Sequence, residues 1–297
     1  MSDLPGFLVY RTMAGFFGLL PEPVMRRSGE LLGFALSYVS RSKFDLLRRH
    51  QRRVLGDVPD LDRRVRRMYA SYGRYWAEVF WVRPRRRDSF AEHANVVGIE
   101  HIHAAKEAGR GIILALPHVG NWEAAGAKAE DLGIPVLAVA EALPNQRLID
   151  WFVDVRRQLG IEVVLAGKGR SVSTRLLRCL KSGGTIALLA DRDLAGRGIE
   201  VDLFGERTTI PPGPVALADK TGAALLPVGC YFKRGRGHTF IVSPAIVIPD
   251  IDGRPERLAA AAQQLASALE DVIRVAPEQW HLFQPNWPSD HAEATAT

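Results

Sequence analysis

The chain has 297 residues, of which 47% are hydrophobic and 24% are charged, and its formal net charge is +6. This length suits one large α/β domain with an N-terminal extension, and the composition excludes both a disordered chain and a multi-span membrane protein. The excess positive charge lies in residues 1–100, which hold 18 Lys and Arg against 11 Asp and Glu. We expect a basic helical region over 1–90, an α/β core over 91–288 and a frayed tail over 289–297.

The first twenty residues are largely apolar, but Arg11 interrupts them and Pro21 follows them. They are too short to span a bilayer comfortably and lack the small-residue cleavage site of a signal peptide. We expect an interfacial, membrane-associating helix whose Arg11 contacts lipid phosphate. The apolar side chains expected in the headgroup region are Phe7, Leu8, Phe16, Phe17, Leu19 and Leu20. The alternative is a helix docked on the core of the protein itself.

Residues 31–80 show helical periodicity, with many arginines between the apolar positions. Basic residues gather in three clusters over 41–53, 63–67 and 83–87. Such a surface suits an anionic membrane, a phosphorylated glycolipid, an acidic carrier protein or nucleic acid, and it is equally compatible with a solvated helix face. The sequence contains no recognition module for nucleic acid, so we expect no nucleic-acid partner.

After Pro84, short apolar runs alternate with amphipathic segments. The runs predict strands near residues 111, 135, 161, 185 and 224, and the segments predict helices over 145–159, 172–184 and 255–275. This alternation predicts an α/β fold with a central mixed sheet flanked by helices. Cys179 and Cys230 lie within apolar runs, without paired or metal-ligand spacing, which favours a reducing, cytosolic compartment.

The stretch GIILALPHVGNWEAAG carries the clearest chemical signal. It places His118 just after a predicted buried strand, where open α/β sheets bind their ligands. Gly120 permits a tight turn, and Asn121 can cap the helix that follows. We expect the carboxylate of Glu123, in the first helical turn, to fix the imidazole of His118 as a general base. The alternative is a histidine that only closes a loop.

Other chemistries lack their motifs in this sequence. There is no HExxH, no Cys/His cluster, no G-x-S-x-G and no phosphate-binding glycine loop. No metal site is therefore expected. A base without a protein nucleophile predicts that His118 deprotonates a substrate hydroxyl, which then attacks an acyl carbonyl directly.

Several stretches carry a family resemblance: ALPHVGNWEAAG, ADRD at 190–193, GIEVDLFGE at 198–206 and IPPGPVALADKTGAALLPV at 210–228. With VAEAL around Glu141, the helix carrying Arg156 and the closing QWHLFQPNW, the chain resembles the lipid A late acyltransferase family from Met1 to Trp287, and most closely its actinobacterial phosphatidylinositol mannoside branch. The resemblance implies an acyltransferase at the cytoplasmic face of the plasma membrane. It would move an acyl group from acyl-CoA, as co-substrate without a further cofactor, to a mannose hydroxyl of a glycolipid.

The same resemblance extends the candidate site beyond His118 and Glu123. It adds Asp191 to the catalytic group, although the branch can carry Glu there and often has Asp where this chain has Glu123. The candidate substrate-binding residues are Glu141, Arg156, Asn121, Arg192 and Phe204. Because Arg156 and Arg157 are adjacent on one helix, only one of them can face the site, and the resemblance favours Arg156.

Each of these roles has a structural alternative. Glu141 can lie at a solvated strand end, and Arg156 can form a surface ion pair with Asp154 or a neighbour. At the end of the strand that carries Asp191, Arg192 and Asp193 can simply form a local ion-pair cluster. Two other functions also stay open. One is acylation of a lipid A precursor or another glycolipid with an acyl carrier protein as donor. The other is non-catalytic binding of lipid or nucleic acid.

Overall fold

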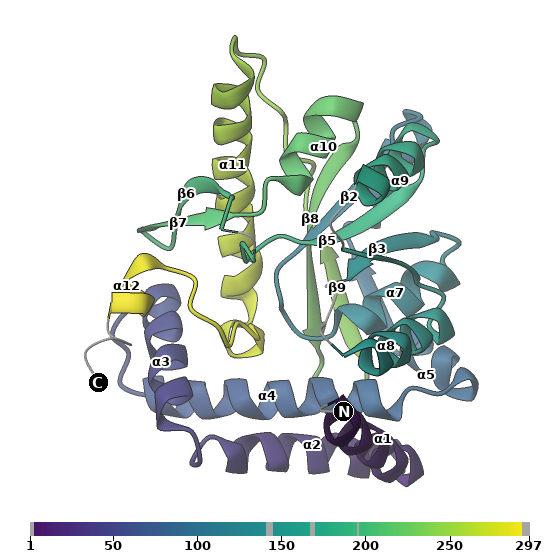
Figure 1. Cartoon of the computed structure of the whole chain (residues 1–297), viewed down its shortest axis with the longest axis vertical. Helices are drawn as coiled ribbons and strands as arrows, with labels where there is room; N and C mark the ends of the chain where they lie inside the picture. The colour runs from purple at the N-terminus through teal and green to yellow at the C-terminus, as the bar shows by residue number, and fades with distance from the viewer. Residues whose placement is uncertain (1–2, 141–144, 167–169, 195, 293–297) are drawn as a thin grey trace.

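The computed structural model describes residues 3–140, 145–166, 170–194 and 196–292. A seven-stranded sheet in the order β1-β9-β8-β2-β5-β3-β4 forms its centre (Figure 1). The β8–β9 pair is antiparallel, and the other strand pairs of this sheet are parallel. This arrangement confirms the predicted central mixed sheet. The strands are β1 Ala94–Val97, β2 Ile112–Leu116, β3 Val136–Ala140, β4 Glu162–Leu165, β5 Thr185–Leu189, β8 Ala224–Phe232 and β9 His238–Val242.

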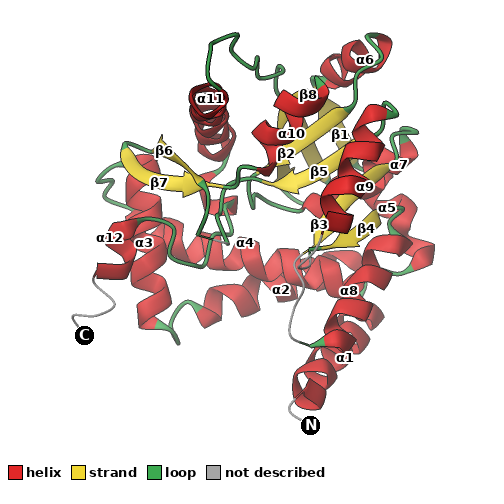
Figure 2. Cartoon of the chain, turned by 45° about the horizontal axis from the view of Figure 1, so that its top comes forward, coloured by secondary structure: helices red, strands yellow, loops and turns green. Residues whose placement is uncertain are grey.

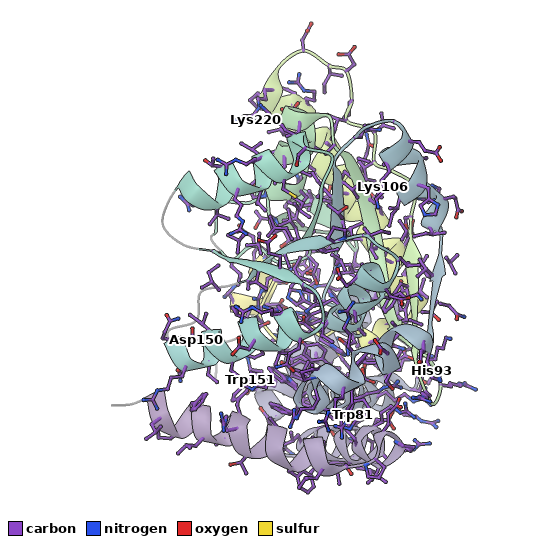
Figure 3. The ribbon with its side chains drawn as sticks, turned by 90° about the vertical axis from the view of Figure 1, so that its right-hand side faces the viewer. Trp81, His93, Lys106, Asp150, Trp151 and Lys220 are labelled. Atoms are coloured by element: carbon purple, nitrogen blue, oxygen red, sulfur yellow. The ribbon has the colours of Figure 1, made fainter. Side chains whose placement is uncertain are left out.

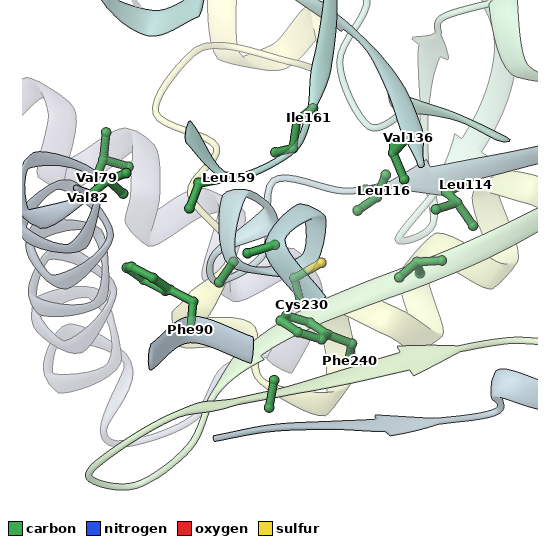
Figure 4. Close-up of a cluster of buried hydrophobic side chains, with 14 of the residues drawn as sticks. Val79, Val82, Phe90, Leu114, Leu116, Val136, Leu159, Ile161, Cys230 and Phe240 are labelled. Atoms are coloured by element: carbon green, nitrogen blue, oxygen red, sulfur yellow. The ribbon is translucent and has the colours of Figure 1, made fainter. Parts of the chain in front are cut away.

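Helices cover both faces of this sheet, as predicted. They are α6 Ile99–Glu107, α7 Trp122–Asp131, α8 Gln146–Gln158, α9 Arg170–Lys181, α10 Gly213–Thr221 and α11 Arg254–Val275. Strand β2 is buried along its whole length, and its side chains alternate between two cores. Ile112, Leu114 and Leu116 join the core under α7 that Figure 4 shows, whereas Ile113 and Ala115 join the core under α11.

Two strands of the central sheet and a separate hairpin were not predicted from the sequence. Strands β1 and β9 are short, and they form strands because β9 pairs with β8 and β1 pairs with β9. A separate antiparallel hairpin, β6 Ile199–Leu203 with β7 Glu206–Ile210, lies beside α11 (Figure 2). Both turn residues of this hairpin, Phe204 and Gly205, have positive φ, at 53° and 75°, as a two-residue hairpin turn requires.

The N-terminal region is a helical layer built on one long helix, α4 (Figure 1). Its elements are α1 Asp3–Leu19, α2 Glu22–Leu36, α3 Arg41–Leu55, α4 Leu61–Trp81, η1 Pro84–Arg86 and α5 Arg87–Glu92. Helices α2 and α4 approach closely at glycines: a Cβ added to Gly33 would lie 2.2 Å from the carbonyl oxygen of Tyr69, and one on Gly73 would lie 2.1 Å from that of Gly29. Small residues here let the two helix backbones pack directly.

Helix α1 has one docked face and one exposed face. Phe17 is 3% exposed and stacks on Phe80 with ring centroids 6.1 Å apart, while Tyr10 contacts Trp151 of α8, which Figure 3 labels. The expectation that Phe17 enters a headgroup region is therefore wrong, because the core of the protein already holds it. The outer face keeps Leu8, Phe16 and Leu19 exposed, and α2 adds exposed Leu31, Leu32, Phe34 and Leu36.

Within the described residues, the helices lack the combination of length and hydropathy that crossing a membrane requires. The chain end also differs from expectation. After η2 Pro277–Gln279, residues expected to fray form α12 Pro288–Ala292. Asp290 is 2% exposed and pairs with His50 at 3.0 Å and Arg53 at 3.0 Å, so buried charge pairing fixes this segment to α3.

Candidate active site

His118 occupies the strand–loop–helix position that the sequence predicts. Strand β2 ends at Leu116, the loop 117–121 follows, and α7 begins at Trp122. Gly120 has φ of 61°, and a Cβ there would lie 1.7 Å from the carbonyl oxygen of Cys230, so only glycine fits this close turn. The loop is held from the other side as well, because the amide of His281 donates to the carbonyl of His118 at 2.6 Å.

Asp191 is the carboxylate that contacts His118. Its Oδ1 lies 2.6 Å from the imidazole Nδ1, and its Oδ2 accepts from the backbone amide of His118 at 3.0 Å. The indole Nε1–H of Trp280 donates to the same Oδ2 at 2.8 Å. Strands β2 and β5 are parallel neighbours, so their carboxyl ends meet at one edge of the sheet. That pairing brings residues 118 and 191 together.

The surroundings of Asp191 keep it ionised. Burial by itself would raise the pKa of this fully buried carboxyl, but the charge of His118 and the hydrogen bonds from His118 and Trp280 outweigh burial and lower the pKa. A neutral imidazole that donates its Nδ1–H to this carboxylate presents an unprotonated Nε2. Nε2 has no hydrogen-bond partner among the described residues, and the imidazole lines a cavity. This is the arrangement of a general base with its orienting acid.

Glu123 has a different partner from the one expected. Its carboxylate, 3% exposed, binds the guanidinium of Arg156 through Nε at 3.0 Å and Nη2 at 2.8 Å. The expected contact of Glu123 with the imidazole is therefore wrong, because Arg156 engages the carboxylate and Asp191 takes Nδ1. Burial would lower the pKa of Arg156, but the charge of Glu123 raises it above its ordinary value. Arg157 faces outward and pairs with Asp154 at 2.7 Å.

Asn121 caps α7, as predicted, and is not exposed to substrate. It is 1% exposed, and its Oδ1 accepts from the amides of Glu123 at 3.0 Å and Ala124 at 3.1 Å. Its amide donates to the buried carboxylate of Glu78 at 2.6 Å. With these atoms engaged, the substrate-binding assignment of Asn121 is wrong, and its role is to start the helix that carries Glu123.

Glu78 of α4 anchors this cap from behind. Its carboxylate also accepts from Arg74 Nε at 2.9 Å and contacts Nε2 of His238 at 2.8 Å. Burial would raise the pKa of Glu78, but the charges and hydrogen bonds of these partners lower it to about 2. Helix α4 thus fixes the start of α7 through a buried, ionised hydrogen-bond network.

The imidazole lines one cavity, and a second cavity adjoins the first. The larger, of about 450 Å³, is lined by His118, Arg156 and Arg192 among mostly apolar side chains that include Trp76, Phe152, Leu188 and Leu189. The smaller, of about 90 Å³, continues between α7 and the sheet and shares Trp122, Val139, Arg156, Leu188 and Leu189 with the larger one. The indole Nε1 of Trp122 is buried and has no partner among the described residues.

Phe204, a further candidate residue, does not line this cavity. Phe204 sits at the β6–β7 turn, where its ring lies 5.8 Å from Trp280 and under the guanidinium of Arg274. It therefore packs behind Asp191 rather than shaping a substrate pocket, because the tight turn directs it toward the α11 core. Glu141 lies outside the described residues, so its assignment remains a prediction.

Sequence reasoning missed three residues of the closing motif QWHLFQPNW. Trp280 donates to Asp191, His281 holds the backbone of His118, and Asn286 donates its side-chain amide to the carbonyl of Asp191 at 3.2 Å. The motif can be read in the sequence, but it lies about 90 residues after Asp191. Only the fold shows that its residues contact His118 and Asp191. As for metals, the described residues contain no group of His, Cys, Asp and Glu arranged to hold an ion.

The structure is an α/β fold in which the His118–Asp191 pair lies at a largely apolar cavity that His118 lines. The family model for bacterial lipid A biosynthesis acyltransferases matches residues 6–289, and the chain belongs to this family. It is therefore an acyltransferase of lipid biosynthesis.

Individual relatives refine this placement. The chain is 40% identical to a phosphatidylinositol mannoside acyltransferase of Mycolicibacterium smegmatis over 82% of its own length and 79% of the relative. It is also 40% identical to the protein of that name from Mycobacterium tuberculosis, over 84% and 78%. A lipid A biosynthesis acyltransferase of Haemophilus influenzae is 26% identical over 66% of the chain and 59% of the relative.

Proposed function

We propose that this enzyme transfers a long acyl chain from acyl-CoA to a mannose hydroxyl of a phosphatidylinositol mannoside, with His118 as general base. The observation that carries the proposal is the imidazole with Asp191 on Nδ1 and an unpartnered Nε2 beside an apolar cavity. The acceptor is supported by the 40% identity to two mycobacterial phosphatidylinositol mannoside acyltransferases.

The reaction needs one proton relay and no covalent enzyme intermediate. Nε2 of His118 accepts the proton of the acceptor hydroxyl as its oxygen attacks the thioester carbonyl carbon. The tetrahedral intermediate collapses, the C–S bond breaks, and the thiolate takes the proton back from the imidazolium, giving an ester and free CoA. Asp191 stabilises the transient imidazolium throughout.

Arg156 is the cation best placed to meet negative charge in the larger cavity. Glu123 engages its Nε and Nη2, and Nη1 has no hydrogen bond with a described residue. We assign this nitrogen to an acidic substrate group or to the developing oxyanion. Arg192 lines the same cavity and supplies a second cationic side chain to substrate.

The exposed apolar faces of α1 and α2 support attachment of this enzyme to a membrane surface. Leu19 is 86% exposed and Leu31 is 67% exposed, on two helices that lie next to each other along α4. Such faces suit an interfacial attachment at the cytoplasmic side of the plasma membrane, where both acyl-CoA and a lipid acceptor are accessible.

A donor and acceptor matrix tests this function. Purified protein is incubated with radiolabelled palmitoyl-CoA or palmitoyl carrier protein, and with phosphatidylinositol mannoside or a lipid A precursor, and the products are separated by thin-layer chromatography. We expect labelled mannoside only with the CoA donor, and loss of about 10²–10⁴-fold in rate for His118→Gln. Transfer to the lipid A precursor alone would refute the proposed acceptor, and transfer from the carrier protein alone would refute the proposed donor. Either result would still support acyl transfer as the reaction.

A further inference from the structure

A third cavity, of about 460 Å³, lies next to η2, just before His281. It is formed by α2, α4, the β8–β9 turn and η2, and it shares no lining residue with the two active-site cavities. Five cationic and two acidic side chains line it. We propose that this basic pocket binds a phosphate group. Binding there can be measured without acyl transfer, so the inference stands apart from the proposed function.

The base of the basic pocket is rigid before any ligand arrives. Arg74 is 4% exposed, and its guanidinium binds Glu78 at 2.9 Å and the carbonyl of Lys233 at 3.0 Å. It also covers the ring of Phe232 at 4.4 Å. These contacts hold the β8–β9 turn against α4, so Lys233 and Arg234 are presented on a fixed hairpin rather than on a loose loop.

The rim of the basic pocket carries cations that are not neutralised by the protein. Arg67 and Arg234 are both exposed, and neither makes an ion pair or a side-chain hydrogen bond with a described residue. Arg27, by contrast, pairs with Glu30 at 3.1 Å. Two guanidiniums from different elements facing one cavity suit a phosphate, because each can donate a fork of hydrogen bonds to its oxygens.

The surroundings of the pocket favour a phosphate carried at a lipid surface. Arg27 and Leu31 share one face of α2, being four residues apart, and Leu31 is 67% exposed. A cationic pocket bordered by exposed apolar side chains suits a headgroup whose acyl chains lie alongside. A soluble phosphate compound presents the same oxygens, so the experiment must separate the two sources.

The basic pocket also adjoins the catalytic loop from behind. Ser71 lines it and lies 2.9 Å, through its Oγ, from Nε2 of His281, whose amide holds the carbonyl of His118. Gln279 lines it as well, and its carbonyl accepts from the amide of Gly120 at 2.9 Å. A phosphate bound here would sit one residue layer behind the loop that carries the base.

The test uses the full chain with two probes. Vesicles of phosphatidylcholine with phosphatidylglycerol are compared with phosphatidylcholine alone by co-sedimentation, and inorganic phosphate is titrated by calorimetry. The pocket variant is Arg67→Gln with Arg234→Gln. The control, Arg63→Gln with Arg85→Gln, removes the same charge from two exposed arginines of the basic N-terminal region that do not line the pocket and make no ion pair with a described residue.

We expect the pocket variant to weaken phosphate-dependent binding by about tenfold or more, and the control by no more than about twofold. If the protein binds anionic vesicles but not inorganic phosphate, the ligand is a lipid headgroup. If it binds inorganic phosphate comparably well, the ligand at the same site is a soluble phosphate compound. Equal losses in both double variants would mean diffuse charge attraction and would overturn the site. So would a parent protein that binds neither probe.

Discussion

Two acid–base pairs, each with a buried carboxylate and a partly exposed base, lie at the active-site cavity. His118 with Asp191 joins the ends of two parallel strands, whereas Glu123 with Arg156 joins two helices, α7 and α8. The first pair contains an imidazole whose Nε2 has no hydrogen-bond partner among the described residues. The second pairs a carboxylate with a permanently charged guanidinium. Burial and an ion pair therefore do not by themselves mark the proton-transfer group.

The two carboxylates, Asp191 and Glu123, are also held in place by different residues. Asp191 receives donors from His118 and Trp280, so its position is fixed independently of substrate. Glu123 is fixed by Arg156, and its helix is started by Asn121, which Glu78 holds. Asp191 should therefore control the rate of transfer, and Glu123 should control mainly the stability of the site.

The largest effect is expected at Asp191. Asp191→Asn should lower kcat by about 10²–10⁴-fold, because an amide can donate to Nδ1 and favour the tautomer whose Nε2 is already protonated. The measurement is the steady-state rate of palmitoyl transfer. Asp154→Asn, on the exposed face of α8, serves as the control and should change kcat by less than about twofold. A loss under about tenfold for Asp191→Asn would remove Asp191 from the proton-transfer pair.

Glu78 tests the support of residues 117–123, which supply one member of each pair. Glu78→Gln should lower the free energy of unfolding by about 3–5 kcal/mol, because Arg74 and its neighbours would stay buried without their counter-charge. Urea denaturation followed by circular dichroism measures the change. Asp62→Asn lies on the same helix but pairs at the surface with Arg48, and it should cost under about 1 kcal/mol. Equal costs for the two variants would contradict a supporting role for Glu78.

Glu123 gives the sharpest contrast with Asp191. Glu123→Gln should lower the free energy of unfolding by about 2 kcal/mol, less than Glu78→Gln, because the Arg156 side chain remains 18% exposed and partly solvated. Its kcat should fall by less than about tenfold. If Glu123→Gln instead loses as much rate as Asp191→Asn while its stability is unchanged, Glu123 would be the orienter of His118 after all.

Acidification should weaken the fold in two stages. Burial, followed by the charge of His118, lowers the pKa of His281 from 6.5 to about 3, so the unfolded state binds a proton that the folded state refuses. Stability should therefore fall as pH drops below about 6.5. A second loss should follow below about pH 4.5, because the pKa of Glu78 in the fold is about 2.

Urea midpoints measured at intervals from about pH 8 to about pH 4 test this order. His281→Gln should flatten the first stage, since it removes the buried imidazole, and should leave the second stage in place. A first stage that persists unchanged in this variant would assign it to other groups, such as the buried His50, whose pKa burial also lowers.

The sequence alone determined the local strand–loop–helix around His118, because its signals lie within a few residues. The buried strand, the glycine turn and the Asn121 cap each follow from short-range sterics and hydrogen bonding. The sequence also predicted the alternation of strands and helices, and with it the mixed sheet. Strands β1 and β9 escaped prediction because short segments become strands only when a neighbour supplies the hydrogen bonds.

Tertiary structure alone decided which carboxylate meets the imidazole. Glu123 is five residues from His118 and Asp191 is 73 residues away, yet the parallel pairing of β2 with β5 brings the distant one to 2.6 Å. The guanidinium of Arg156 binds the nearer carboxylate instead. His118 thus keeps the position that its local sequence indicates, while the register of the sheet sets which carboxylate contacts its imidazole.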